Sequence, residues 1–212
     1  MGQYYYPTLL DEQYNMDGCL YSYSYNEDLK LMEHSYMGAD FVNAVLAKIK
    51  DNPMRVAWIG DYSNDPWSGK EPYQNKIPKE QFKEIFDKVY GDNNRDCQIY
   101  PEPIEGFDKA TDYNGWFLVN HTRRSYVDLG DFQHKNGWQE EWNGEKHWES
   151  IHPLPLLTAC GNDRGGGDYH ARYPDCDKCG LWAFDLIEFT DSVPAEYSRE
   201  EYRFIERIDD DN

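Results

Sequence analysis

The sequence predicts one α+β domain over residues 1–208, followed by an acidic tail over 209–212. We expect an antiparallel or mixed sheet of about six strands that carries two amphipathic helices on one face. Two stretches repeat apolar residues at helical spacing, and several short apolar stretches lie between turn-forming residues. A chain of 212 residues is long enough to bury one sizeable core, so one domain is the default.

The helices are the clearest local signals. Apolar residues recur at helical spacing over Ala39–Asp51, and the Asn-Pro pair that follows ends the helix. A second helix is predicted over 78–91, from a proline at its favoured first position to a closing glycine. Its mixed charged face is expected to be solvated surface. A short last helix is predicted to begin at Ser198, which forms a capping box with Glu201.

The strands are shorter and depend on the turns between them. The first two are expected to form a hairpin through residues 15–18, and the fourth and fifth to pair through a turn at 121–124. The stretch Leu29–Tyr36 is ambiguous between strand and loop. The predicted strands are Gln3–Leu10, Cys19–Tyr25, Met54–Ile59, Gly115–Asn120, Ser125–Leu129 and Leu181–Phe189.

The segment 130–152 carries three tryptophans and three histidines among glutamate, glutamine and asparagine. If its aromatic rings are exposed, it forms a patch for a partner; if it folds down, it is a lid over the core. The sequence does not choose between these alternatives.

The charge balance restricts the partners. A formal net charge of −19, from 21 basic and 40 acidic residues, argues against binding to a phosphate backbone, which needs a basic surface. It fits a basic protein partner or simple solubility. Aromatic residues make up 16% of the chain, so we expect it to fold despite its polarity. Five cysteines without regular spacing, no signal-peptide pattern and no membrane-spanning run predict a cytoplasmic location.

A glycine-rich loop is the most unusual stretch of the chain. Gly165, Gly166 and Gly167 follow Arg164 and precede Asp168, and ordering three successive glycines needs a backbone reason. Their N–H groups could form a nest for an anion, but the Lys-Ser/Thr pair of a P-loop is absent. The alternative is a flexible loop between two strands. A predicted ligand-binding set for a nucleotide-like anion combines the loop with its basic neighbours: Arg164, Gly165, Gly166, Gly167, Asp168, His170 and Arg172.

A Cys-x-x-Cys turn suggests zinc. Cys176 and Cys179 have the spacing of half a zinc site, and Cys160 and His170 beside the glycine-rich loop could complete four ligands. Such a site would be structural, because it leaves no open coordination position. The alternative is two thiols in a tight turn, or a redox-labile pair.

A carboxylate at a strand end suggests an enzyme. Asp61 follows the predicted strand Met54–Ile59, where it could act as a base or bind a metal, with His34 or His170 as proton carrier. It could equally cap the loop that follows. No catalytic triad spacing, metalloprotease motif or nucleotide fingerprint is present.

Four stretches carry a resemblance: the opening Met-Gly-Gln-Tyr-Tyr, Leu29–Tyr36, Trp58–Tyr62 and Gly161–Tyr169. Together they resemble uncharacterised small proteins of Gram-positive bacteria and of their phages and mobile elements. The resemblance covers most of the chain but brings no assigned activity and no catalytic residues. It implies a cytoplasmic accessory protein, such as a phage or mobile-element inhibitor of host defence.

These observations lead to one functional prediction with two alternatives. We expect a non-enzymatic binding protein whose acidic surface engages a basic, nucleic-acid-handling protein. The first alternative is the binding of a small anionic ligand, such as a nucleotide signal, at the glycine-rich loop. The second is a hydrolase or transferase that uses Asp61.

Overall fold

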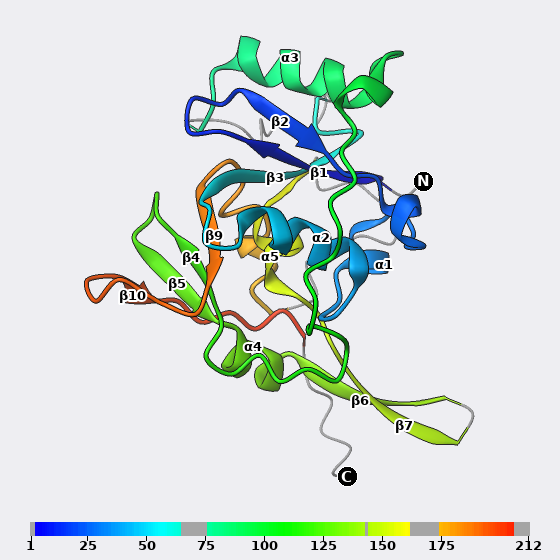
Figure 1. Ribbon diagram of the computed structural model, residues 1–212, viewed down its shortest axis with the longest axis vertical. Helices are drawn as coiled ribbons and strands as arrows, with labels where there is room; N and C mark the ends of the chain where they lie inside the picture. Colours follow the sequence, from blue (N-terminus) through cyan, green and yellow to red (C-terminus); the bar gives the residue numbers. More distant parts are fainter. Residues whose placement is uncertain (1–2, 65–75, 143, 162–173, 206–212) are drawn as a thin grey trace.

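The computed structural model of the chain describes residues 3–64, 76–142, 144–161 and 174–205 (Figure 1). These residues form a mixed α+β fold around a main sheet of eight strands in the order β10-β5-β4-β9-β3-β1-β2, with β8 paired to β3. A separate sheet is made of β6 and β7. The strands are β1 Tyr5–Leu10, β2 Met16–Cys19, β3 Met54–Gly60, β4 Phe117–Asn120, β5 Ser125–Asp128, β6 Gly137–Trp142, β7 Glu145–Ser150, β8 Ala159–Cys160, β9 Leu186–Thr190 and β10 Ser198–Arg199.

The α+β class is confirmed, and the sheet is larger than the predicted six strands. Two of its strands, β8 and β10, have only two residues each, too few for any alternation of side chains to mark them in the sequence. Both pair in parallel, β8 with β3 and β10 with β5, while the other strand pairs are antiparallel. The sheet is therefore mixed.

The described residues contain five α-helices and three short 3-10 turns. The two predicted amphipathic helices are present as α2 and α3, and Pro78 lies at the N-cap of α3 rather than inside it. The helices are α1 Leu31–His34, α2 Asp40–Ile49, α3 Lys79–Tyr90, α4 Leu129–Lys135 and α5 Pro153–Leu157, and the 3-10 turns are η1 Ser22–Tyr25, η2 Asn94–Cys97 and η3 Cys176–Lys178.

The prediction that both amphipathic helices lie on one face of the sheet was wrong. Alternate residues of β3 separate into two cores: Val56 and Trp58 pack with α2, whereas Ala57 and Ile59 pack with α3. Figure 1 shows α3 and α2 on opposite sides of the β1–β2–β3 region. Each helix reveals its own apolar stripe in the sequence, but not the side of the sheet that the stripe will cover. Because both faces of the sheet are covered at β3, nearly every residue of this strand is buried.

Several local predictions also change. The segment 19–25 is mostly η1 rather than a strand, so β2 pairs with β1 over 16–19 instead. The strand predicted from Leu181 begins only at Leu186, because 180–185 form turns in which Phe184 has a φ of +64°. The hairpin of β4 and β5 is confirmed, with Asn120 opposite Ser125.

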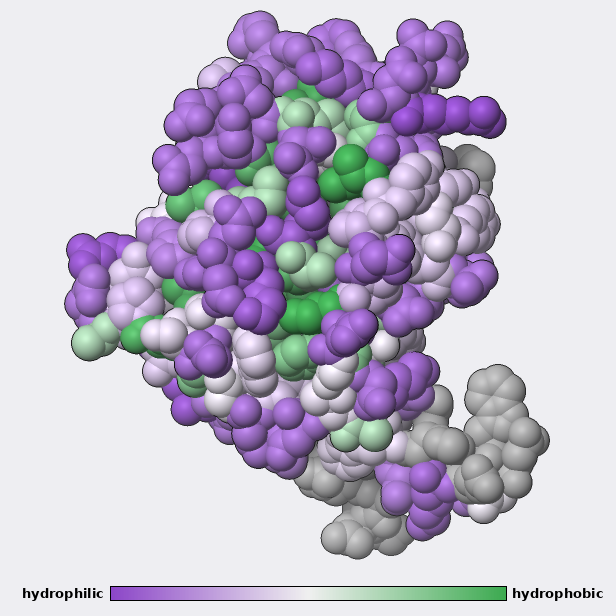
Figure 2. Space-filling model, viewed as in Figure 1, coloured by the Kyte–Doolittle hydropathy of each residue, from purple (hydrophilic) through white to green (hydrophobic). Residues whose placement is uncertain are grey.

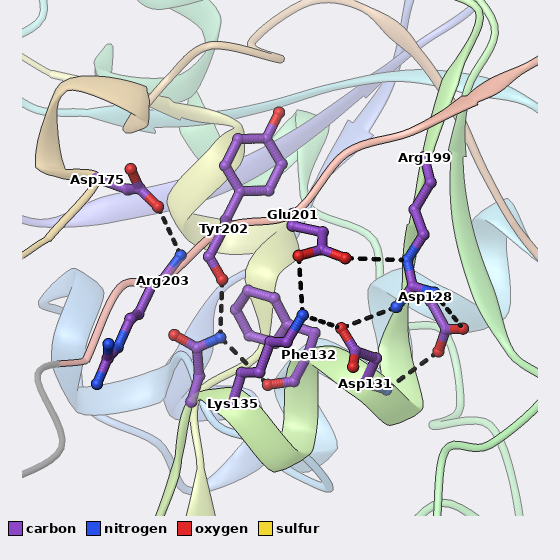
Figure 3. Close-up of polar contacts among 10 residues, drawn as sticks. Asp128, Asp131, Phe132, Lys135, Asp175, Arg199, Glu201, Tyr202 and Arg203 are labelled. Carbon is purple, nitrogen blue, oxygen red and sulfur yellow. Dashed lines mark hydrogen bonds and ion pairs between the residues drawn. The ribbon is translucent and has the colours of Figure 1, made fainter.

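The last predicted helix is absent. Ser198 and Arg199 form β10, and residues 200–205 run irregularly beside α4 (Figure 3). Asn136, which is fully buried, donates to the carbonyl of Tyr202 (3.0 Å) and accepts from the N–H of Phe204 (2.6 Å). The capping-box spacing is a local signal, and these long-range contacts replace the helix that it suggests.

The segment rich in tryptophan and histidine forms α4 and a β6–β7 hairpin that projects from the body of the molecule (Figure 1). Trp138 packs against Tyr36 and the main core, whereas Trp148 is 41% exposed. His152 is buried at the N-cap of α5. The base of this segment is therefore packed on the core and its hairpin extends outward, and the alternative of a patch for a partner stays a prediction.

Candidate functional site

A groove of about 740 Å³ opens beside the C-terminal half of α3, between that helix, the turn after it, η2 and β2. Helix α3 ends where the N–H of Gly91 bonds to the carbonyl of Asp87 (2.8 Å), and the chain then enters η2. After η2, the N–H of Ile99 bonds to the carbonyl of Cys19 (2.9 Å), which holds this segment beside β2. Residues distant in sequence thus form the two walls.

The groove is strongly acidic. Its charged lining has five carboxylates and one ammonium group, a net charge of −4: Asp17, Glu84, Asp87, Asp92, Asp96 and Lys88. Figure 2 shows hydrophilic residues covering the end of the molecule that α3 occupies. From the sequence, this helix face is predicted to be ordinary solvated surface, because only the fold brings β2 and η2 against it.

Lysines neutralise only part of this charge. Asp17 pairs with Lys48 (2.9 Å), and Glu84 pairs with Lys88 (2.8 Å). Lys83 pairs with Asp87 along α3. Within the part of the chain that the structure describes, Asp92 and Asp96 make no ion pair. These two carboxylates have no neutralising lysine among the described residues, so the groove retains a negative field that attracts cationic groups.

A second polar region lies where β3 and β8 end. Trp58 pairs with Ala159 and Ile59 with Cys160 in parallel register, so the carboxyl ends of both strands are neighbours. Asp61 follows β3, and Gly161 follows β8 at the start of the glycine-rich loop. In open, mostly parallel α/β sheets, ligands bind beside the carboxyl ends of the strands, and the β3–β8 pair has that arrangement locally within this mostly antiparallel sheet.

A buried glutamine occupies this region. Gln3 is fully buried; its Oε1 accepts from the hydroxyl of Tyr5 (2.9 Å), and its Nε2 has no hydrogen-bond partner within the described residues. A Cβ on Gly60 would lie 2.5 Å from Gln3 Nε2, and one on Gly161 would lie 2.5 Å from the Tyr5 hydroxyl. Only glycine leaves room for Gln3 at these two positions. Nothing in the sequence marks Gln3 as a site residue, because a single glutamine near the N-terminus belongs to no pattern.

The predicted ligand-binding residues Arg164, Gly165, Gly166, Gly167, Asp168, His170 and Arg172 lie outside the described residues. The structure therefore places the strand that leads into the glycine-rich loop, and the prediction of an anion site on the loop itself stays a prediction.

The enzyme alternative rests on Asp61 and a histidine. The carboxylate of Asp61 accepts from the N–H of Tyr4 (3.1 Å), and burial raises its pKa above the usual value. His34 is fully buried under Trp58: its Nε2 accepts from the indole N–H (3.0 Å), and its Nδ1 lies 2.9 Å from the carbonyl of Asp28. Both ring nitrogens are thus engaged inside the core, and burial lowers the pKa of His34 to about 4. Such a histidine serves packing, not proton transfer at neutral pH.

The zinc prediction has three of its four residues in the described part of the chain. Cys160 is buried in the core on the α3 side, and burial raises the pKa of its thiol. Cys179 packs against the other core, on the α2 side, and Cys176 opens η3. Among the described residues, no three His, Cys, Asp or Glu side chains are grouped so that they could hold a metal ion. His170 lies outside these residues, so the complete ligand set is untested.

None of the described helices combines the length and the apolar composition that a bilayer-spanning segment needs. Comparison of the chain with protein-family models, with curated proteins and with solved structures finds no match in any of the three.

Proposed function

We propose that this chain is a non-enzymatic binding protein whose acidic groove takes a Lys/Arg-rich segment of a basic protein. The observation that carries the proposal is the groove beside α3, with five carboxylates against one ammonium group in a volume of about 740 Å³. A space of this size accommodates several side chains of an extended or helical segment. Charge complementarity of this kind increases association rates and selects partners of the opposite sign.

Nucleic-acid-handling proteins are the class of partner that fits best, because they carry clustered lysine and arginine for phosphate contacts. A groove lined with carboxylates would occupy such a cluster and compete with nucleic acid for it. This mode of action suits an inhibitor of host defence in phages or mobile elements, which is the context that the sequence resemblance implies.

Removing the charges of Asp92 and Asp96 tests whether the groove binds the basic segment. Both carboxylates line it without an ion pair in the described part of the chain, so Asp92→Asn with Asp96→Asn removes charge without breaking internal contacts. We expect the affinity for a Lys/Arg-rich peptide, measured by fluorescence anisotropy at low salt, to fall about fivefold to tenfold. Added salt should weaken the binding of the unaltered chain in the same assay.

The matched control is Glu105→Gln with Asp191→Asn, which removes the same charge from exposed positions outside the groove lining. The control variant should bind nearly as tightly as the unaltered chain. An equal loss in both variants would show that total charge, not the groove, drives association. Failure of the unaltered chain to bind the peptide at low salt would refute the proposed function.

A second candidate is a small anionic ligand at the joint end of β3 and β8. The observation that favours it is the fully buried amide of Gln3, whose Nε2 donor has no partner within the described residues, beside the start of the glycine-rich loop. A buried donor without an acceptor costs about 1–3 kcal/mol, which a ligand oxygen would recover. The Asp61-based hydrolase has no comparable support.

Thermal-shift measurements with nucleotides and cyclic nucleotides test this second candidate. At about 100-fold excess over Kd, a ligand should stabilise the chain by about 2.7 kcal/mol and raise Tm by roughly 5–10 °C. Gln3→Met keeps the size of the side chain but removes the donor, so it should abolish most of the shift. If none of these compounds shifts the Tm of the unaltered chain, the nucleotide alternative is wrong.

A further inference from the structure

Two cysteine thiols from distant parts of the sequence meet beside the acidic groove, which one of them, Cys97, lines. The Sγ atoms of Cys19, at the end of β2, and Cys97, at the end of η2, lie 3.2 Å apart, although 78 positions separate the residues. Neither is in a disulfide. Cysteines so far apart form no spacing motif, so the sequence alone does not relate these two.

The backbone around the pair is well placed for a covalent bond. Cys19 forms a parallel bridge with Gln98, the residue after Cys97, and its carbonyl accepts from the N–H of Ile99 (2.9 Å). A disulfide has its sulfurs about 2.05 Å apart, so the two Sγ atoms need to approach by only about 1 Å. Hydrogen bonds between the flanking segments already hold the two residues side by side, so rotation of the two side chains can supply much of this movement.

The two thiols differ in access and in reactivity. Cys19 is 2% exposed, whereas Cys97 is half-buried and lines the groove. The hydrogen bond with Cys19 lowers the pKa of Cys97, although partial burial and the neighbouring Asp96 carboxylate oppose this shift. The same hydrogen bond, together with burial, raises the pKa of Cys19. An accessible thiol with more thiolate character is the one that attacks an oxidant, and the buried neighbour then resolves the product.

We propose that Cys97 and Cys19 form a redox pair that low-molecular-weight cationic disulfides, such as cystamine, oxidise to an intramolecular disulfide. The thiolate of Cys97 attacks one sulfur of the oxidant, whose own S–S bond breaks and releases one thiolate. Cys19 then loses its proton and attacks Cys97 Sγ, which breaks the mixed disulfide and releases the second thiol. Two protein thiols are oxidised to one disulfide, and the oxidant is reduced to two thiols.

The remaining cysteines provide internal comparisons. Cys160 is fully buried, and Cys176 and Cys179 are half-buried in and beside η3. If exposure alone controlled oxidation, the η3 thiols would react as readily as Cys97. The proposal depends instead on the proximity of a resolving thiol. It is independent of the proposed binding function, because it concerns the isolated chain.

The test is to incubate the full chain with mixtures of cysteamine and cystamine, whose ammonium groups suit the acidic groove, and to measure the products by intact mass and non-reducing peptide mapping. We expect a product that has lost two hydrogen atoms, whose peptide map links Cys19 to Cys97, and which excess thiol reverses. The bond closes a loop between residues 78 apart, so the oxidised chain should melt about 5 °C or more above the reduced one.

Single substitutions separate the roles of the two thiols. Cys19→Ser should trap one cysteamine on Cys97, because no resolving thiol remains, while Cys97→Ser should block cross-linking and leave Cys19 unmodified. Cys176→Ser is the matched control and should cross-link like the unaltered chain. Peptide mapping of the unaltered chain that finds no Cys19–Cys97 link, or finds a different link first, overturns the proposal whether or not the variants fold.

Discussion

Acidification below about pH 6.5 is expected to destabilise this chain by several kcal/mol, because two buried histidines must take up protons on unfolding. Burial lowers the pKa of His34 to about 4 and that of His152 to about 3, from 6.5 in the unfolded chain. The folded pKa values lie below the unfolded value, so this stability is fully present above pH 6.5 and is lost as the pH falls. Each histidine contributes a slope of about 1.4 kcal/mol per pH unit.

Both histidines are buried and hydrogen-bonded in the folded chain, although their partners differ. His34 is held between the indole of Trp58 and the carbonyl of Asp28. His152 is fully buried, and its Nδ1 accepts from the N–H of Leu154 (3.2 Å) at the start of α5. A proton on His152 Nδ1 would break this cap, and a proton on His34 Nε2 would oppose the indole donor.

Urea unfolding at a series of pH values measures the effect. His152→Asn is the informative variant, since asparagine can also accept a hydrogen bond at an N-cap but does not titrate. Below about pH 6.5, the free energy of unfolding of the variant should fall with pH less steeply than that of the unaltered chain, by about 1.4 kcal/mol per pH unit. Taking the difference between the two chains cancels the contributions of the carboxylates, which both chains share. An unchanged slope would mean that His152 is protonated equally in both states.

Replacing Asn136 by alanine is expected to reduce the free energy of unfolding by about 3 kcal/mol, with a range of roughly 2–4 kcal/mol. Its Nδ2 donates to the carbonyls of Phe132 (3.1 Å) and Tyr202 (3.0 Å), and its Oδ1 accepts from the N–H groups of Phe204 (2.6 Å) and Ile205 (3.3 Å). The substitution leaves buried backbone groups without this partner. It should also release residues 202–205 from α4, which hydrogen exchange would detect.

The ion pairs beside Asn136 supply the matched control. Lys135 pairs with Asp131 and Glu201 (2.8 Å each), and Arg199 pairs with Asp131 (2.8 Å), as Figure 3 shows. These side chains are partly exposed, so Glu201→Gln should change stability by less than about 1 kcal/mol. Equal losses in Asn136→Ala and Glu201→Gln would show that the surface network, rather than the buried amide, holds the C-terminal segment.

Local patterns identified the elements whose signals lie within one stretch of the chain. Helices α2 and α3 follow directly from their apolar spacing and end where proline and glycine indicate. Strand β3 and the β4–β5 hairpin follow from apolar runs bounded by turn residues. The capping-box spacing at Ser198 failed because Asn136 and β5 provide stronger, distant partners for that segment.

The candidate site was less accessible to sequence reasoning. Asp61 and Gly161 stood out as a strand-end carboxylate and the start of a glycine-rich loop, but the sequence did not indicate that β3 and β8 run side by side. The groove was not predicted, since the charged face of α3 alone is typical of any solvated helix. Its walls are completed by β2, whose residues lie far from α3 in the sequence, and by η2, which carries no periodicity of its own.

Composition alone established the acidic character of the chain, because charge is a sum over residues and needs no coordinates. That the chain does not bind a phosphate backbone stays a prediction from this charge. Helix positions and the α+β class can likewise be predicted from patterns of residues a few positions apart. The side of the sheet that each helix covers, the meeting of Cys19 with Cys97 and the burial of Gln3 are decided by contacts between distant segments. Such contacts depend on how the elements pack together, and no single stretch of sequence encodes that arrangement.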